Sequence, residues 1–146
     1  MEYKVVKQLS FSAINSNKWY TYQLVNEDGG ILSSVCVENE EPIDKFRYVR
    51  EFKDKKIAYI FNFETSNGNR KKGYGRYLLK DVIRRFKGKY DIIHLNACPY
   101  YLKDNDVIYE SPKDGLNKQK LIKFYESLGF ESYKTLVNGW EIMLLK

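Results

Sequence analysis

The sequence predicts an α+β fold in a single domain that spans residues 1–146. Three observations lead to this prediction. Strand-like runs joined by turns fill the first third of the chain. In its middle an alternating apolar run, a basic turn with glycines and an amphipathic helix follow one another, and a second hairpin closes the chain. This order of elements is typical of a mixed sheet with helices packed on it.

Composition narrows the class of protein. A chain of 146 residues with 43% apolar residues can bury a core of its own. The net charge of +6 favours anionic partners such as nucleic acid, membrane surfaces or phosphorylated cofactors. Cys36 and Cys98 match no metal-ligand or redox spacing, so we expect no metal. No signal-peptide pattern and no membrane-spanning run is present, and we therefore expect a cytoplasmic protein without a membrane partner.

The first third predicts a meander of strands. Aromatic and β-branched residues favour strands over Tyr3–Ser12, Trp19–Val25 and Ile31–Val37. Asp28-Gly29-Gly30, between the last two runs, is a strong hairpin signal. Residues 38–56 are charged, and their few apolar residues at helical spacing indicate at most a short helix.

The middle of the chain predicts a strand, a turn, a helix and a second strand. In the run Lys56–Thr65, Ile60 and Asn62 alternate with Tyr59, Phe61 and Phe63. The helix after the turn has a one-sided apolar stripe of Leu78, Leu79, Val82, Ile83 and Phe86, and we expect it to end at Gly88. The strand Asp91–Ala97 follows, parallel to the first if the helix makes a right-handed crossover.

The last third predicts a long connection, a helix and a hairpin. Residues 98–115 show no clear periodicity, and an irregular connection of this length is usually functional or disordered. We expect the second helix over Leu116–Leu128. The final hairpin joins Phe130–Val137 to Trp140–Leu145 through a two-residue turn at Asn138-Gly139.

The basic turn, Asn69 to Arg76, points to phosphate binding. It places backbone N–H groups at a helix N-terminus, where the helix dipole also favours an anion. A P-loop would need a lysine and a hydroxyl where Tyr74 and Gly75 stand, and a dinucleotide-binding turn would need a glycine where Leu78 stands. Both of these phosphate motifs therefore fail.

A third motif fits the turn. Arg70-x-x-Gly73-x-Gly75 resembles the signature with which the GCN5-related N-acetyltransferase (GNAT) superfamily binds the diphosphate of coenzyme A. The segment Leu121–Phe130 also resembles that family's helix-ending segment, and the likeness covers about Lys56 to Lys146. The resemblance implies a mixed, mostly antiparallel central sheet with a splayed parallel strand pair and flanking helices. Family members usually carry two helices between their first two strands, where this chain has only a turn.

The resemblance also implies an activity. It implies acetyl-CoA as cosubstrate and transfer of the acetyl group to a primary amine by direct attack in a ternary complex. The acceptor would be a small molecule or a protein, and a homodimer is compatible with the family. The residues expected to bind the cofactor are Phe63, Thr65, Arg70, Lys71, Lys72, Gly73, Tyr74, Gly75 and Arg76.

Three residues are candidates for catalysis. Tyr125 matches the helix tyrosine that lies near the coenzyme A sulfur in the family, and it is expected to protonate the departing thiolate. For the base, His94 stands in the strand where some relatives carry a catalytic glutamate, and Glu64 stands on the central strand. A hydrogen-bonded strand histidine and a solvated carboxylate are the ordinary alternatives for these two.

Acceptor recognition and two competing functions stay open. The 98–115 connection carries tyrosines and acids that would suit a cationic acceptor: Tyr100, Tyr101, Asp104, Asp106, Tyr109 and Glu110. A solvated loop is equally consistent with these residues. A GNAT fold without catalysis would serve as a coenzyme A-binding or interaction module. A nucleic-acid-binding domain would use the basic clusters at Arg70–Lys72 and Arg84–Lys89, but no nucleic-acid-reading motif accompanies them.

Overall fold

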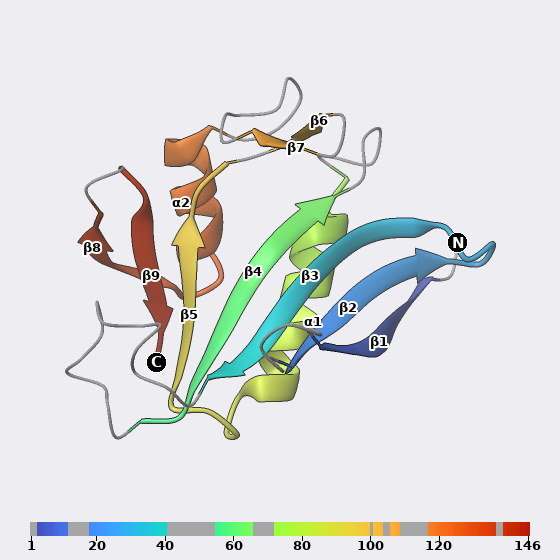
Figure 1. The fold of residues 1–146 in the computed structure, drawn as a ribbon, viewed down its shortest axis with the longest axis horizontal. Coiled ribbons are helices and arrows are strands. Elements are labelled where there is room, and N and C mark those ends of the chain that lie inside the picture. Colours follow the sequence, from blue (N-terminus) through green and yellow to red (C-terminus); the bar gives the residue numbers. More distant parts are fainter. Residues whose placement is uncertain are drawn as a thin grey trace. The chain divides into compact units, whose positions relative to one another are not determined.

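In this computed structural model the described residues are 3–11, 18–40, 55–65, 72–99, 101–103, 106–108, 117–136 and 139–146. Seven strands form one sheet in the order β1-β2-β3-β4-β5-β9-β8, mostly antiparallel with one parallel pair, and two further strands form a small second sheet (Figure 1). By packing, the chain divides into two compact units, residues 1–93 and residues 94–146. Among the described residues, no helix is long and apolar enough to cross a membrane.

The first unit is a meander of four strands with one helix on it. Its elements are β1 (Tyr3–Phe11), β2 (Lys18–Asn26), β3 (Ile31–Glu40), β4 (Ile57–Thr65) and α1 (Tyr74–Phe86). Each strand pairs antiparallel with the next, and α1 contacts β2, β3 and β4 (Figure 1). The buried core joins the apolar stripe of α1 to one face of the strands: Tyr22, Leu24, Val35, Val37, Ile60, Leu78, Leu79, Val82 and Phe86. The predicted strands and helix of this region are confirmed.

The β2–β3 hairpin forms at the predicted glycines. The Asn26 N–H donates to the Gly30 carbonyl over 2.9 Å, and the Gly29 N–H donates to the Asn26 carbonyl over 3.0 Å. Gly29 has φ 82, a left-handed conformation that glycine adopts without strain. The Asn26 side chain accepts hydrogen bonds from the Asp28 and Gly30 N–H groups. The sequence signal for this turn therefore reflects the positive φ at Gly29, and the hydrogen bonds to the Asn26 side chain stabilise the turn further.

Strand β4 contains a bulge that the sequence did not reveal. Cys36 lies opposite Phe61 and Ser34 lies opposite Glu64, so β4 has one residue more than β3 over this interval. Asn62 has φ 50 there, a conformation that asparagine tolerates better than most residues. One extra residue reverses the alternation of side chains beyond it. The predicted alternation is therefore wrong after Phe61.

Helix α1 ends before Gly88 in the way that was expected. The last helical residue is Phe86, and Lys87 is extended with φ −61 and ψ 126. Gly88 follows with φ 89, and the Lys89 N–H donates to the Phe86 carbonyl over 3.0 Å. These angles and this bond define a type II turn, whose third residue must have positive φ. Gly88 therefore stands directly after the C-cap residue Lys87, and its positive φ allows the turn that ends the helix.

The second unit carries most of β5 (Ile92–Ala97), then β6 (Tyr101–Lys103), β7 (Asp106–Ile108), α2 (Lys118–Glu126), β8 (Glu131–Thr135) and β9 (Glu141–Leu145). The 98–115 connection was expected to be irregular, but β6 and β7 pair antiparallel within it. Strands of three residues are too short to produce a periodic pattern. Helix α2 begins at Lys118, not Leu116, because the Asn117 side chain accepts a hydrogen bond from the Lys120 N–H over 2.9 Å and caps the helix.

The closing hairpin has a longer loop than predicted. The Leu136 N–H donates to the Trp140 carbonyl and the Gly139 N–H donates to the Leu136 carbonyl, both over 2.8 Å. Three residues therefore separate the closing pair, in place of the two expected. Gly139 has φ 88, which matches the position of Gly29 in the first hairpin. Both hairpins are thus closed by three-residue loops that end in a left-handed glycine.

Several predictions fall outside the described residues. These concern the turn at Asn15–Asn17, most of the segment 38–56 in which a short helix was possible (residues 41–54), Arg70, Lys71 and the connection residues Tyr100, Asp104, Tyr109 and Glu110. Glu38 to Glu40, which the prediction placed in that charged segment, belong to β3.

Candidate cofactor and catalytic site

The N-terminus of α1 has the features of an anion site. Its N-cap is Gly73, with φ 82 and ψ 4, and no side chain accepts a hydrogen bond there. The first turn carries no acidic residue, and the first bond within the helix runs from the Tyr77 N–H to the Gly73 carbonyl. The preceding N–H groups have no carbonyl acceptor inside the helix, and the helix dipole adds a partial positive charge to them. A phosphate oxygen is the acceptor that this arrangement suits best.

The two glycines of the turn are required for different reasons. At Gly73 an added Cβ would meet nothing within 4 Å, but its positive φ strains any other residue. At Gly75 an added Cβ would lie 2.9 Å from Phe63 Cζ and 2.9 Å from Thr65 Oγ1. Gly75 therefore lets the helix start lie directly against the end of β4. The structure thus brings together three of the predicted cofactor-binding residues, Phe63, Thr65 and Gly75.

A buried serine holds the end of β4 in place. Ser33 is 1% exposed, and its hydroxyl donates to the Glu64 carbonyl over 2.8 Å. Its oxygen also lies 3.2 Å from Thr65 Oγ1, and because the Ser33 proton is already donated, Thr65 is the donor in this second bond. Sequence reasoning missed Ser33, since its only signal is a polar residue beside the apolar Leu32 in a strand-like run.

Aromatic rings order the first turn of α1. The Tyr3 ring packs edge-on against Tyr74 and Tyr77, with centroids 5.8 and 5.0 Å apart. Near the turn along the chain, Lys72 is exposed and Arg76 is half-buried. Sequence reasoning missed Tyr3 because it comes from the start of β1, far from the turn along the chain.

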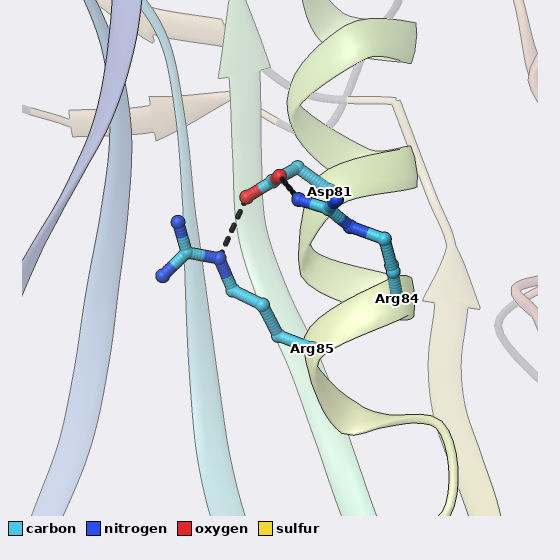
Figure 2. Close-up of polar contacts among 3 residues, drawn as sticks. All are labelled: Asp81, Arg84 and Arg85. Atoms are coloured by element: carbon cyan, nitrogen blue, oxygen red, sulfur yellow. Dashed lines mark hydrogen bonds and ion pairs between the residues drawn. The ribbon is translucent and has the colours of Figure 1, made fainter.

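The positive charge of the arginines in the C-terminal part of α1 is partly neutralised. Asp81 forms ion pairs with both Arg84 and Arg85, the latter over 2.7 Å (Figure 2). The Arg85 guanidinium also lies over the Tyr22 ring, 5.5 Å from its centroid. Two cations of the Arg84–Lys89 cluster are thus engaged within the first unit, which weakens the case for that cluster as a phosphate-binding stripe for nucleic acid.

Glu64 lies at the exposed end of β4. The bulge at Asn62 turns its side chain away from Phe63 and Thr65, to the face of the sheet that carries Tyr59 and Phe61. Its carboxylate is exposed, whereas its own carbonyl is held by Ser33. An exposed carboxylate can take a proton from an amine directly or through water.

His94, on β5 in the second unit, is enclosed. It is 3% exposed, and burial lowers its pKa from 6.5 to about 4, against a smaller opposing effect of the Asn96 side chain. A histidine with this pKa is neutral at physiological pH, because burial penalises the charged imidazolium.

Tyr125, on α2 of the same unit, is 5% exposed. Its ring packs edge-on against Phe124 and Phe130, with centroids 5.4 and 5.9 Å apart. The Tyr125 carbonyl accepts hydrogen bonds from the N–H groups of Leu128 and Phe130, which fix the turn between α2 and β8. The segment that resembled the GNAT helix end, Leu121–Phe130, is therefore the end of a helix and the turn that leads into β8.

Comparison with known proteins places the fold. No protein-family profile matches the chain, and no curated protein sequence does. Solved structures do match it. An acetyltransferase of the GNAT family from Listeria monocytogenes has a TM-score of 0.58 at 13% identity, over 85% of this chain and 62% of its own. Arabidopsis thaliana NAA60, in complex with a bisubstrate analogue, has a TM-score of 0.56 at 14% identity, over 89% and 75%.

PH1933 from Pyrococcus horikoshii has a TM-score of 0.57 at 20% identity, over 86% of this chain. The chain spans only 64% of the length of PH1933 and 62% of the Listeria protein. The mostly antiparallel seven-stranded sheet with one parallel pair and two helices agrees with the architecture that the resemblance implied. The chain therefore has the fold of the GCN5-related N-acetyltransferases.

Proposed function

We propose that the chain is an acetyl-CoA-dependent N-acetyltransferase that acts on a primary amine. The observation that supports this most is the N-terminus of α1, where Gly73 leaves the helix without a side-chain cap and Gly75 lies flush against β4. These residues fit the diphosphate of coenzyme A, since a row of N–H donors with no acidic residue in the first turn of the helix favours an anion.

The cosubstrate supplies an activated thioester, and the chain supplies binding and proton transfer. N–H groups at the start of α1, with Lys72 and Arg76 beside them and Arg70 and Lys71 preceding them, hold the diphosphate. The acceptor nitrogen forms the new N–C bond as the C–S bond breaks, so one proton must leave the nitrogen and one must reach the sulfur. In this proposal Tyr125 delivers the proton to the sulfur.

Glu64 is the residue we propose as the base. Its carboxylate is exposed, so a bound amine or an ordered water can reach it. His94, the other candidate, is enclosed and has a pKa of about 4, so it is a weak proton acceptor at physiological pH. A neutral, buried histidine suits a structural role in β5 better than exchange of protons with a substrate.

Two measurements test the proposal. Thermal unfolding with saturating acetyl-CoA should show a raised Tm, because a ligand that binds only the folded state stabilises it. A free-thiol assay with a panel of primary amines should then show amine-dependent release of coenzyme A. No shift in Tm contradicts acetyl-CoA binding. A shift without thiol release from any amine favours a non-catalytic coenzyme A-binding module instead.

A further inference from the structure

The face of the first unit opposite α1 carries an ordered set of side chains. The pairing of β2, β3 and β4 arranges them in three rows across the strands. The rows are Trp19–Glu38–Tyr59, Thr21–Cys36–Phe61 and Gln23–Ser34–Glu64. Residues directly opposite each other in antiparallel strands point to the same side of a sheet, so all three rows share one face.

The bulge in β4 determines the third row. Without the extra residue at Asn62, Glu64 would point to the α1 side together with Ile60. With it, Glu64 joins Tyr59 and Phe61. An electrostatic effect agrees with this placement, since the pKa of the Cys36 thiol is raised mainly by burial and further by the negative charge of Glu64. The bulge therefore places a carboxylate at one end of an aromatic surface.

The aromatic side chains of this face lie together. Trp19 and Phe61 pack edge-on with centroids 6.5 Å apart, and Tyr59 stacks on Phe61 with centroids 5.5 Å apart. All three residues are half-buried. Glu38 stands on β3 between Trp19 and Tyr59. A carboxylate flanked by aromatic rings is a favourable environment for an organic cation, which gains both ion pairing and cation–π attraction.

The local charge supports the same ligand class. None of the residues in the three rows is a lysine or an arginine, and two of them, Glu38 and Glu64, are acidic. The chain as a whole has a net charge of +6. The three rows themselves are thus acidic on a basic protein, and they complement a cationic ligand.

We propose that Trp19, Glu38 and Tyr59 bind a cationic group of the acceptor, and that the acceptor therefore carries a second positive charge besides the amine that is acetylated. This inference rests on the proposed function, in which Glu64 receives the proton of the reacting amine. Glu38 and Ser34 are four positions apart on β3, so the two rows are separated by about 13 Å. The acceptor class is therefore a long diamine or a polyamine.

A kinetic comparison tests this inference. Diaminooctane and octylamine have the same chain, but only the first has a second ammonium group. Glu38→Gln should raise the KM for diaminooctane about tenfold while kcat and the KM for octylamine stay unchanged. Glu131→Gln removes an exposed carboxylate from β8 and is the matched control, which should change neither KM. Equal KM changes for both amines in Glu38→Gln would overturn the inference.

A binding experiment separates failure of this inference from failure of the proposed function. The chain has two tryptophans, so in a Trp140→Phe variant the fluorescence reports on Trp19 alone. Diaminooctane should change this fluorescence at concentrations where octylamine does not, and adding Glu38→Gln should weaken the response about tenfold. If no amine is acetylated but this response is present, the enzyme proposal fails and the cation site stands. If amines are acetylated and the response is absent, the cation site is rejected.

Discussion

Gly75 and Thr65 approach so closely that a Cβ atom on Gly75 would lie 2.9 Å from the Thr65 hydroxyl oxygen. Thr65 is itself held by its hydrogen bond to Ser33, which is buried between the strands and α1. The start of the helix and the end of β4 are therefore coupled through one glycine. This contact fixes where the N–H groups of α1 stand relative to the strand.

Gly75→Ala should lower the free energy of unfolding by about 2 kcal/mol, because the added methyl group forces Thr65 or Phe63 to move. The measurement is urea unfolding of a double-mutant cycle with Thr65→Ala. Removal of the Thr65 hydroxyl opens space, so the alanine at position 75 should cost about 1 kcal/mol less in that background. Strictly additive costs would show that the two residues do not compete for the same space.

His94 should make the protein sensitive to acid. The unfolded histidine has a pKa of about 6.5 and the folded one a pKa of about 4, so the unfolded state binds the proton more readily. Stability is independent of this group above about pH 6.5 and falls as the pH drops towards 4, by roughly 3 kcal/mol in all. Urea unfolding should therefore show that the free energy of unfolding falls more steeply with decreasing pH in the natural protein than in His94→Gln. The carboxylates of the two proteins titrate alike, so the difference reports on His94.

The same histidine can be titrated directly. It is the only histidine in the chain, so its imidazole resonances need no assignment. In proton NMR they should not shift between about pH 8 and pH 5.5. A midpoint near 6.5 would mean that the imidazole is exposed to water, and would restore His94 as a candidate base.

Tyr125→Phe separates chemistry from packing. Phenylalanine keeps the ring contacts with Phe124 and Phe130, so we expect little change in Tm. Loss of the hydroxyl removes the proposed acid and should lower kcat about a hundredfold with little change in the KM for acetyl-CoA. Tyr133→Phe removes a hydroxyl from β8 and is the control. Full activity in Tyr125→Phe would reduce Tyr125 to a core residue.

The sequence predicted the parts of the fold and site that depend on short-range pattern. The glycine turn before α1 was recognisable because Gly73 and Gly75 stand at a fixed offset from the apolar stripe of α1, and its binding of phosphate stays a prediction. The hairpin at Gly29 was recognisable because a positive φ there calls for glycine. That residues 1–146 form a single domain stays a prediction.

The parts that were missed depend on pairing between distant residues. The bulge at Asn62 exists only relative to β3, where Val35 faces two residues of β4, so no pattern within β4 reveals it. Ser33 and Tyr3 support the turn from other strands. The row of Trp19, Glu38 and Tyr59 likewise comes from three strands and appears only once their register is known.

The central claim is that the start of α1 binds the diphosphate of acetyl-CoA. The variant Gly73→Asp places a carboxylate at the N-cap, where it would accept hydrogen bonds from the same N–H groups and repel the diphosphate. The variant Gly88→Asp is matched to it, because Gly88 also has a positive φ and open space around its Cα but lies after the helix. Gly73→Asn is a further control for backbone strain, since asparagine tolerates this conformation without the charge.

The decisive measurement is the Kd of acetyl-CoA by isothermal titration calorimetry for the natural protein and these variants. We predict that Gly73→Asp weakens binding about a hundredfold and that Gly88→Asp leaves it within about twofold, with Gly73→Asn in between. Equal Kd values for Gly73→Asp and Gly88→Asp, in proteins that are both folded, would contradict the claim.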